Sequence, residues 1–186
     1  MGSSVENRAR IVTEIVRQIK EQSGADFPIF VKLNATDGFQ PGSQKADLGI
    51  NILQFMETAK LLEKTGVCSI EINGGISEAG GVTLRTAINS PAEEVYFREY
   101  SQAITKVANI PIMLVRGIRS LSVMENLLEE GYADLISMSR PLICEPDRVS
   151  KRTSGKAKRA MCASCNLCFD LKGIMCNYEF NRNSGN

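Results

Sequence analysis

Helix-like and strand-like segments alternate four times along this chain. The helix-like segments carry apolar residues at three- and four-residue spacing, and each is followed by a short apolar run rich in β-branched residues. We expect helices at residues 6–23, 50–64, 92–107 and 121–130, and strands at residues 27–34, 67–72, 110–115 and 133–138. This alternation predicts an α/β fold with a parallel sheet and right-handed crossovers.

Two architectures share this pattern. An open, doubly wound sheet has the same periodicity as four units of a (βα)8 barrel, and four strands are too few to close a barrel of the usual eight. The run at residues 27–34 is typical of a strand buried on both faces. In both architectures ligands bind beyond the carboxyl ends of the strands, so the strand ends are the places where a site is expected.

Polar and glycine residues lie at the end of each expected strand. These strand ends are Lys32, Asn73-Gly74-Gly75, Arg116-Gly117 and Ser139-Arg140. Glycines would let the turn at residues 73–75 approach a ligand closely. The last two turns offer backbone amides and guanidinium groups, which suit a phosphate. The alternative is that Gly117 only makes a tight turn and that both arginines are solvated surface residues.

Lys32 interrupts an apolar run, and an unpaired ammonium is costly to bury there. We expect it to contact an anion, a ligand or water. A structural salt bridge, for instance to Glu71 on the following strand, is the competing interpretation.

Four of the six cysteines lie close together near the C-terminus. The spacing is Cys162-x2-Cys165-x2-Cys168-x7-Cys176. Thiolate groups of this density bind iron–sulfur clusters or tetrahedral zinc, and reduced cysteines without metal are the alternative. A basic stretch at residues 150–160, without apolar periodicity, precedes the cysteines and is interpreted as a connector.

Composition narrows the classes of function. The formal net charge is +1 with both signs interspersed, so neither nucleic acid nor an anionic membrane is an expected partner. No apolar run approaches the roughly 20 residues that cross a bilayer, and the first ten residues lack the apolar core of a signal peptide, which predicts a cytoplasmic protein. The chain has no histidine, which removes the commonest general acid or base.

Four segments resemble the old yellow enzyme-like NADH:flavin oxidoreductases, a family that includes the 2,4-dienoyl-CoA reductases. Residues 2–8 look like the segment after the fourth barrel strand, residues 30–33 like strand five, residues 116–119 like the turn after strand seven, and residues 134–142 like strand eight and its exit. The family more often has glycine at the positions of Arg116 and Ser139.

The resemblance implies the C-terminal half of a (βα)8 TIM barrel, about four βα units, followed by a Cys-rich tail. Residues 1–149 would form the half-barrel with part of an FMN site, and residues 150–186 the basic connector and Cys-rich segment. The ring of FMN would contact Lys32, and the FMN phosphate would be held by Arg116, Gly117, Ser139 and Arg140. The dienoyl-CoA reductase branch binds a [4Fe-4S] cluster through a similar cysteine group.

The resemblance also implies an activity that needs more than this chain. In the complete enzyme NAD(P)H would reduce the flavin, which would pass hydride to a small alkene. The catalytic residues are unknown, because the family supplies them from its first four strands. We therefore expect a fragment that forms a homodimer or pairs with the missing half. The alternative function is a non-catalytic, self-associating half-barrel module that binds metal or none.

Overall fold

The computed structural model describes residues 4–39, 42–43, 45, 49–79, 84–156, 158–170 and 173–178. Residues 2–3 of the first family-like segment and residues 179–186 of the expected tail lie outside these ranges. A parallel sheet has four strands in the order β1 (Phe30–Asn34), β2 (Ser69–Asn73), β3 (Ile112–Leu114) and β4 (Leu135–Ile136). Each strand pairs with the next strand in the sequence, as expected for consecutive right-handed βα units.

The main helices are α1 (Val5–Ser23), α2 (Ile52–Lys64), α3 (Arg98–Thr105) and α4 (Leu121–Glu129). Capping residues fix the ends of helices α1 and α2. The side chain of Ser4 accepts a hydrogen bond from the amide of Asn7, and Asn51 and Gln54 form a reciprocal capping box at the start of α2. Gly24 ends α1 with φ of 96°, a left-handed conformation that glycine adopts at little cost.

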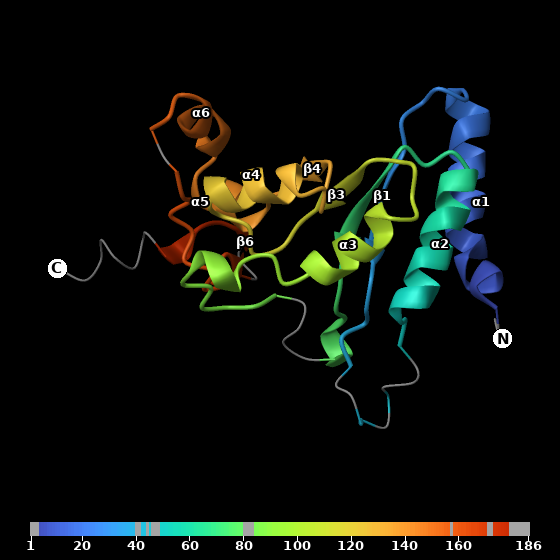
Figure 1. Cartoon of the computed structure of the whole chain (residues 1–186), viewed down its shortest axis with the longest axis horizontal. Helices are drawn as coiled ribbons and strands as arrows, with labels where there is room; N and C mark the ends of the chain where they lie inside the picture. Colours follow the sequence, from blue (N-terminus) through green and yellow to red (C-terminus); the bar gives the residue numbers. More distant parts are fainter. Residues whose placement is uncertain are drawn as a thin grey trace.

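The core lies between the sheet and these helices. Helix α1 packs on α2, α2 packs on α3 and β1, and α3 packs on β3. Alternate strand residues point to this side, and the fully buried ones include Ile70, Ile72 and Leu114. In Figure 1, α1 lies at one end of the molecule and the C-terminal segment at the other.

The described residues cover the opposite face of the sheet less completely than the helices cover the first face. Phe30 is 64% exposed and Leu135 is 49% exposed, although both belong to strands of a parallel sheet. The prediction that residues 27–34 form a strand buried on both faces is therefore wrong for this chain. The strand also begins later than expected, at Phe30, because Pro28 has no amide to donate to a sheet.

The expected helix at residues 92–107 is divided in two. A short 3-10 helix, η3 (Pro91–Glu93), ends at Glu94, whose backbone is extended, and α3 begins only at Arg98. Val95 between them has φ of 62°, which no helix contains. The carboxylate of Glu94 binds the start of α4, and this tertiary contact overrides the helical periodicity.

Further short elements follow β4. They are α5 (Arg140–Cys144), α6 (Arg148–Thr153) and the hairpin β5 (Phe169–Asp170) with β6 (Gly173–Ile174). One more short 3-10 helix, η2 (Ser77–Ala79), lies earlier in the chain, between β2 and η3. The stretch interpreted as a connector thus contains part of a helix, α6, and its end pairs with the start of α4 through a bridge between Ser120 and Arg159. No helix in the described part of the chain is long and apolar enough to cross a membrane.

Candidate functional site

A cavity of about 260 Å³ opens at the carboxyl ends of the strands, and we call it the strand-end pocket. All five residues predicted to bind a cofactor line it, so the structure brings them together. The full lining comprises Lys32, Leu84, Val115, Arg116, Gly117, Ile118, Arg119, Ser137, Met138, Ser139, Arg140, Pro141, Cys162, Ser164 and Phe169. The turn at residues 73–75 is not among them.

The strand-end pocket is cationic. Lys32, Arg116, Arg119 and Arg140 line it, and none of its described lining residues is acidic. Guanidinium and ammonium groups at one cavity attract and bind phosphate or carboxylate oxygens. The arrangement therefore suits an anionic ligand, or the anionic end of a larger one.

Lys32 extends from β1 across the open face of the sheet. Its ammonium forms an ion pair with Oε1 of Glu71 on β2, directly opposite in the strand register. The other oxygen of Glu71 accepts a hydrogen bond of 2.7 Å from the hydroxyl of Ser137. The predicted salt bridge is confirmed, while the contact between Lys32 and a ligand stays a prediction.

Arg116 follows β3 with φ of 95°, in the left-handed region that favours glycine. Its Nε and Nη2 atoms donate to Oδ1 of Asn73 at 2.7 and 2.5 Å, and Nδ2 of Asn73 donates to Asn34 at 3.0 Å. These bonds offset the backbone strain and tie the turn to the two preceding strands. The guanidinium is thus already partnered at the edge of the strand-end pocket, and Arg116 is no freely solvated surface residue.

Ser139 and Arg140 lie where β4 leads into α5. The Arg140 side chain is buried, and its Nη1 atom donates to the Arg85 carbonyl at 3.0 Å and to Oδ1 of Asn166 at 2.6 Å. Asn166 in turn donates to the carbonyl of Leu84 at 2.9 Å. The alternative that Arg140 is a solvated surface residue is therefore wrong.

Gly117 and Gly74 are both required by packing. A Cβ atom at Gly117 would come within 3.0 Å of the Tyr96 ring, and φ there is 73°. A Cβ atom at Gly74 would come within 2.6 Å of Phe97. Close approach of a ligand is the role that the sequence predicts for the glycines of residues 73–75, whereas in the structure Gly74 makes room for a core aromatic ring.

The four predicted metal ligands line one small second cavity of about 10 Å³, together with Cys144. In the part of the chain that the structure describes, no group of three or more His, Cys, Asp or Glu residues could hold a metal ion. Burial also raises the pKa of the Cys168 thiol, which favours its protonated form. A metal site at these four cysteines therefore stays a prediction, which iron and zinc assays would test.

Cys162 and Arg140 line both cavities, so the cysteine-bearing segment forms one wall of the strand-end pocket. Sequence reasoning did not assign this wall, which also includes Ser164 and Phe169. It also did not assign Arg119 to the cavity. The only sequence signal for Arg119 was its place in the turn after β3, three residues after Arg116.

A family model for the NADH:flavin oxidoreductase / NADH oxidase family matches residues 1–159. The chain belongs to this family. It is 35% identical over 167 residues to an NADH oxidase from Thermoanaerobacter brockii, a match that covers 89% of this chain and 24% of that protein. It is 30% identical over 151 residues to the NADH-dependent flavin oxidoreductase iccE from Talaromyces variabilis, covering 78% of this chain and 35% of the relative.

Solved structures of old yellow enzyme-like members share the fold. The structure of 2-naphthoyl-CoA reductase with 2-naphthoyl-CoA superposes with a TM-score of 0.80 at 27% identity, over 94% of this chain and 26% of that one. An old yellow enzyme homologue from Zymomonas mobilis gives a TM-score of 0.60 at 19% identity, over 93% of this chain and 44% of that one. The chain spans about a quarter to a third of the two sequence relatives.

Proposed function

We propose that this chain supplies one part of the flavin site of an FMN-dependent NAD(P)H oxidoreductase of the ene-reductase type. The observation that carries the proposal is the strand-end pocket, where four cationic side chains and no described acidic one meet at the carboxyl ends of parallel strands. Family membership and the position of the cavity support FMN as the ligand.

Each predicted residue has a role in this proposal. Arg116, Gly117, Ser139 and Arg140 hold the phosphate through guanidinium groups and backbone amides, and Lys32 contacts the ring. The ion pair with Glu71 holds the ammonium of Lys32, which lines the pocket, against β2. When bound, FMN supplies the hydride chemistry between NAD(P)H and a small alkene, and the chain orients it and balances its charge.

We further propose that residues 1–149 form half of a (βα)8 barrel and that residues 150–186 form a separate Cys-rich region. The open face of the sheet supports this arrangement. Parallel sheets are normally covered on both faces, and the exposed Phe30 and Leu135 side chains mark the face that lacks a cover. In the proposal, further strands cover it, from the remainder of the protein or from a second copy of this chain.

The proposal is tested by titrating the chain with FMN and with riboflavin, which lacks the phosphate, and following flavin fluorescence. For Arg140→Met we expect the Kd for FMN to rise about tenfold to hundredfold, as for loss of a charge-assisted hydrogen bond, and the Kd for riboflavin to change little. Arg10→Met on the exposed surface of α1 is the matched control for charge. Equal binding of both ligands by the unaltered chain would contradict a phosphate site.

The exposed Phe30 and Leu135 side chains also favour the second candidate, a non-catalytic module that associates through its open sheet face. It predicts a colourless dimer that binds no FMN. Sedimentation of the unaltered chain and of Phe30→Ser tests it. Loss of the dimer in Phe30→Ser without FMN binding by either protein would favour the module over the flavin site.

A further inference from the structure

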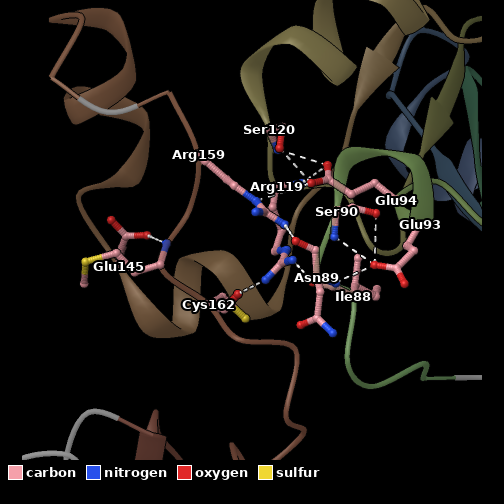
Figure 2. Close-up of polar contacts among 11 residues, drawn as sticks. Ile88, Asn89, Ser90, Glu93, Glu94, Arg119, Ser120, Glu145, Arg159 and Cys162 are labelled. Atoms are coloured by element: carbon pink, nitrogen blue, oxygen red, sulfur yellow. Dashed lines mark hydrogen bonds and ion pairs between the residues drawn. The ribbon is translucent and has the colours of Figure 1, made fainter.

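Two buried charged residues, Glu94 and Arg119, join segments that are far apart in the sequence (Figure 2). Glu94 follows η3, and Arg119 lies in the turn between β3 and α4. Only 5% of each residue is exposed to solvent. A buried charge needs partners that offset its lost hydration, so the contacts of this pair indicate what the pair is for.

Glu94 organises the turn. Its Oε2 atom accepts hydrogen bonds from the amides of Arg119 at 2.8 Å and Ser120 at 3.0 Å, and its Oε1 atom accepts one from the Ser120 hydroxyl at 2.7 Å. Ser120 is the N-cap of α4, yet its own side chain forms no capping bond. Glu94 therefore satisfies amides that the start of a helix leaves free, and it fixes the backbone that carries the Arg119 side chain.

Arg119 binds the cysteine-bearing segment. Its Nη1 atom donates to the carbonyl of Cys162, and its Nη2 atom donates to the carbonyl of Ile88 (Figure 2). The backbone adds a second attachment nearby, because the amide of Ala160 donates to the carbonyl of Arg119 at 3.0 Å. One guanidinium thus links the segment before α3, the turn after β3 and the C-terminal segment.

These contacts reach the candidate ligand site, because Arg119 and Cys162 both line the strand-end pocket. The Arg119 side chain donates to the carbonyl groups of Cys162 and Ile88. The position of Cys162, and with it this wall of the cavity, therefore depends on Arg119. Burial lowers the pKa of the Arg119 guanidinium, because removal from water disfavours the charged form.

We infer that Arg119 is a positioning residue, which holds the Cys162 segment in place as a wall of the strand-end pocket. As far as that pocket is a flavin site, the inference rests on the proposed function. The position of the segment itself does not depend on a bound ligand, so the two proposals can fail separately.

The test measures alkylation of each cysteine in the full chain by iodoacetamide and mass spectrometry. In Arg119→Met we expect Cys162, which is buried, to react about tenfold to hundredfold faster, because a charge-assisted fork is lost and the segment opens locally. Cys68, which is partly buried directly before β2, is the internal reference, because it lies away from the Cys162 segment and would react faster if the whole chain were destabilised.

Two further variants sharpen the result. Arg119→Lys keeps the charge but cannot bridge both carbonyls, and we expect an intermediate rate at Cys162. Arg159→Met removes a charge from the same segment, where Arg159 donates to the carbonyl of Asn89 at 2.9 Å and its Nε atom lies 3.8 Å from Oε1 of Glu94. It leaves both Arg119 bonds and the hydrogen bonds that Glu94 accepts from the turn. We expect Cys162 to stay protected in Arg159→Met. A folded Arg119→Met with unchanged Cys162 reactivity, or with Cys68 accelerated equally, would overturn the inference.

Flavin titration separates this inference from the proposed function. Replacing a residue that positions the wall should raise the Kd for FMN and for riboflavin alike. Replacing a residue that binds the phosphate, such as Arg140, should raise the Kd for FMN alone. If the unaltered chain binds neither flavin, the proposed function fails and cysteine alkylation still decides the role of Arg119. If flavin binds and Arg119→Met exposes Cys162 without changing either Kd, Arg119 does not position the pocket wall and the inference is wrong.

Discussion

The two faces of the sheet differ sharply in what they carry. On the helix-covered face, Ile70, Ile72 and Leu114 are fully buried. On the open face, the outward-pointing residues of the sheet include exposed Phe30 and Leu135 and the ion pair of Lys32 with Glu71. The comparison shows that the covered face supplies the stability of the chain, while the open face carries the groups available to a ligand or a partner.

The largest expected effect compares two leucines of adjacent strands. Leu114→Ala on the covered face should lower the free energy of unfolding by about 2–5 kcal/mol, because it leaves a cavity in the core. Leu135→Ala, with the side chain already half exposed, should cost about 1 kcal/mol or less. Urea denaturation measures both, and equal losses would mean that the open face is covered in solution.

Gly74→Ala tests how far the core extends toward the strand ends. The added methyl group would lie 2.6 Å from the ring of Phe97, so we expect a loss of about 1–3 kcal/mol from overpacking. Thermal or urea unfolding measures this loss. In a Phe97→Leu background the same change should cost less, and an unchanged cost would show that Phe97 is not the neighbour that matters.

Lys32→Met tests the open face as a binding surface. The ion pair with Glu71 is partly solvated, so the free energy of unfolding should change by about 1 kcal/mol or less. If Lys32 contacts the ring, the Kd for FMN and riboflavin should rise about tenfold. Lys60→Met, on the exposed surface of α2, is the control for charge. Loss of stability without loss of flavin affinity would reduce Lys32 to a structural role.

The smallest expected effect is on stability at acid pH and comes from Glu93, an exposed residue outside the sheet. Hydrogen bonds from the backbone amides of Ser90 and Asn89 lower the pKa of Glu93 in the folded chain. The stabilisation is therefore present above the unfolded pKa of Glu93, near 4.5, and is lost as the pH falls through its lower folded value. In Glu93→Gln the unfolding midpoint should fall slightly less steeply as the pH is lowered. An unchanged pH dependence would contradict a stabilising role for the Glu93 carboxylate.

Much of the architecture could be predicted from the sequence. The period of the apolar residues identified four helices and four parallel strands, because local periodicity reflects which face of each element is buried. Their bounds were less accurate where tertiary contacts intervene, as at Glu94 and Val95, where a cap on α4 interrupts an apparently helical pattern. The order of the strands in the sheet also required the structure.

The sequence by itself determined the chemistry of the strand ends, since a lysine near the end of one parallel strand and arginines directly after two others must lie toward one edge of a sheet. Only the tertiary structure decided which of these charges are already partnered. Arg116 binds Asn73, Arg140 binds Asn166, and Arg119 reaches Cys162 across 43 positions of the chain. Hydrogen bonds over such separations depend on how the packed elements bring distant backbone together, which no local pattern records.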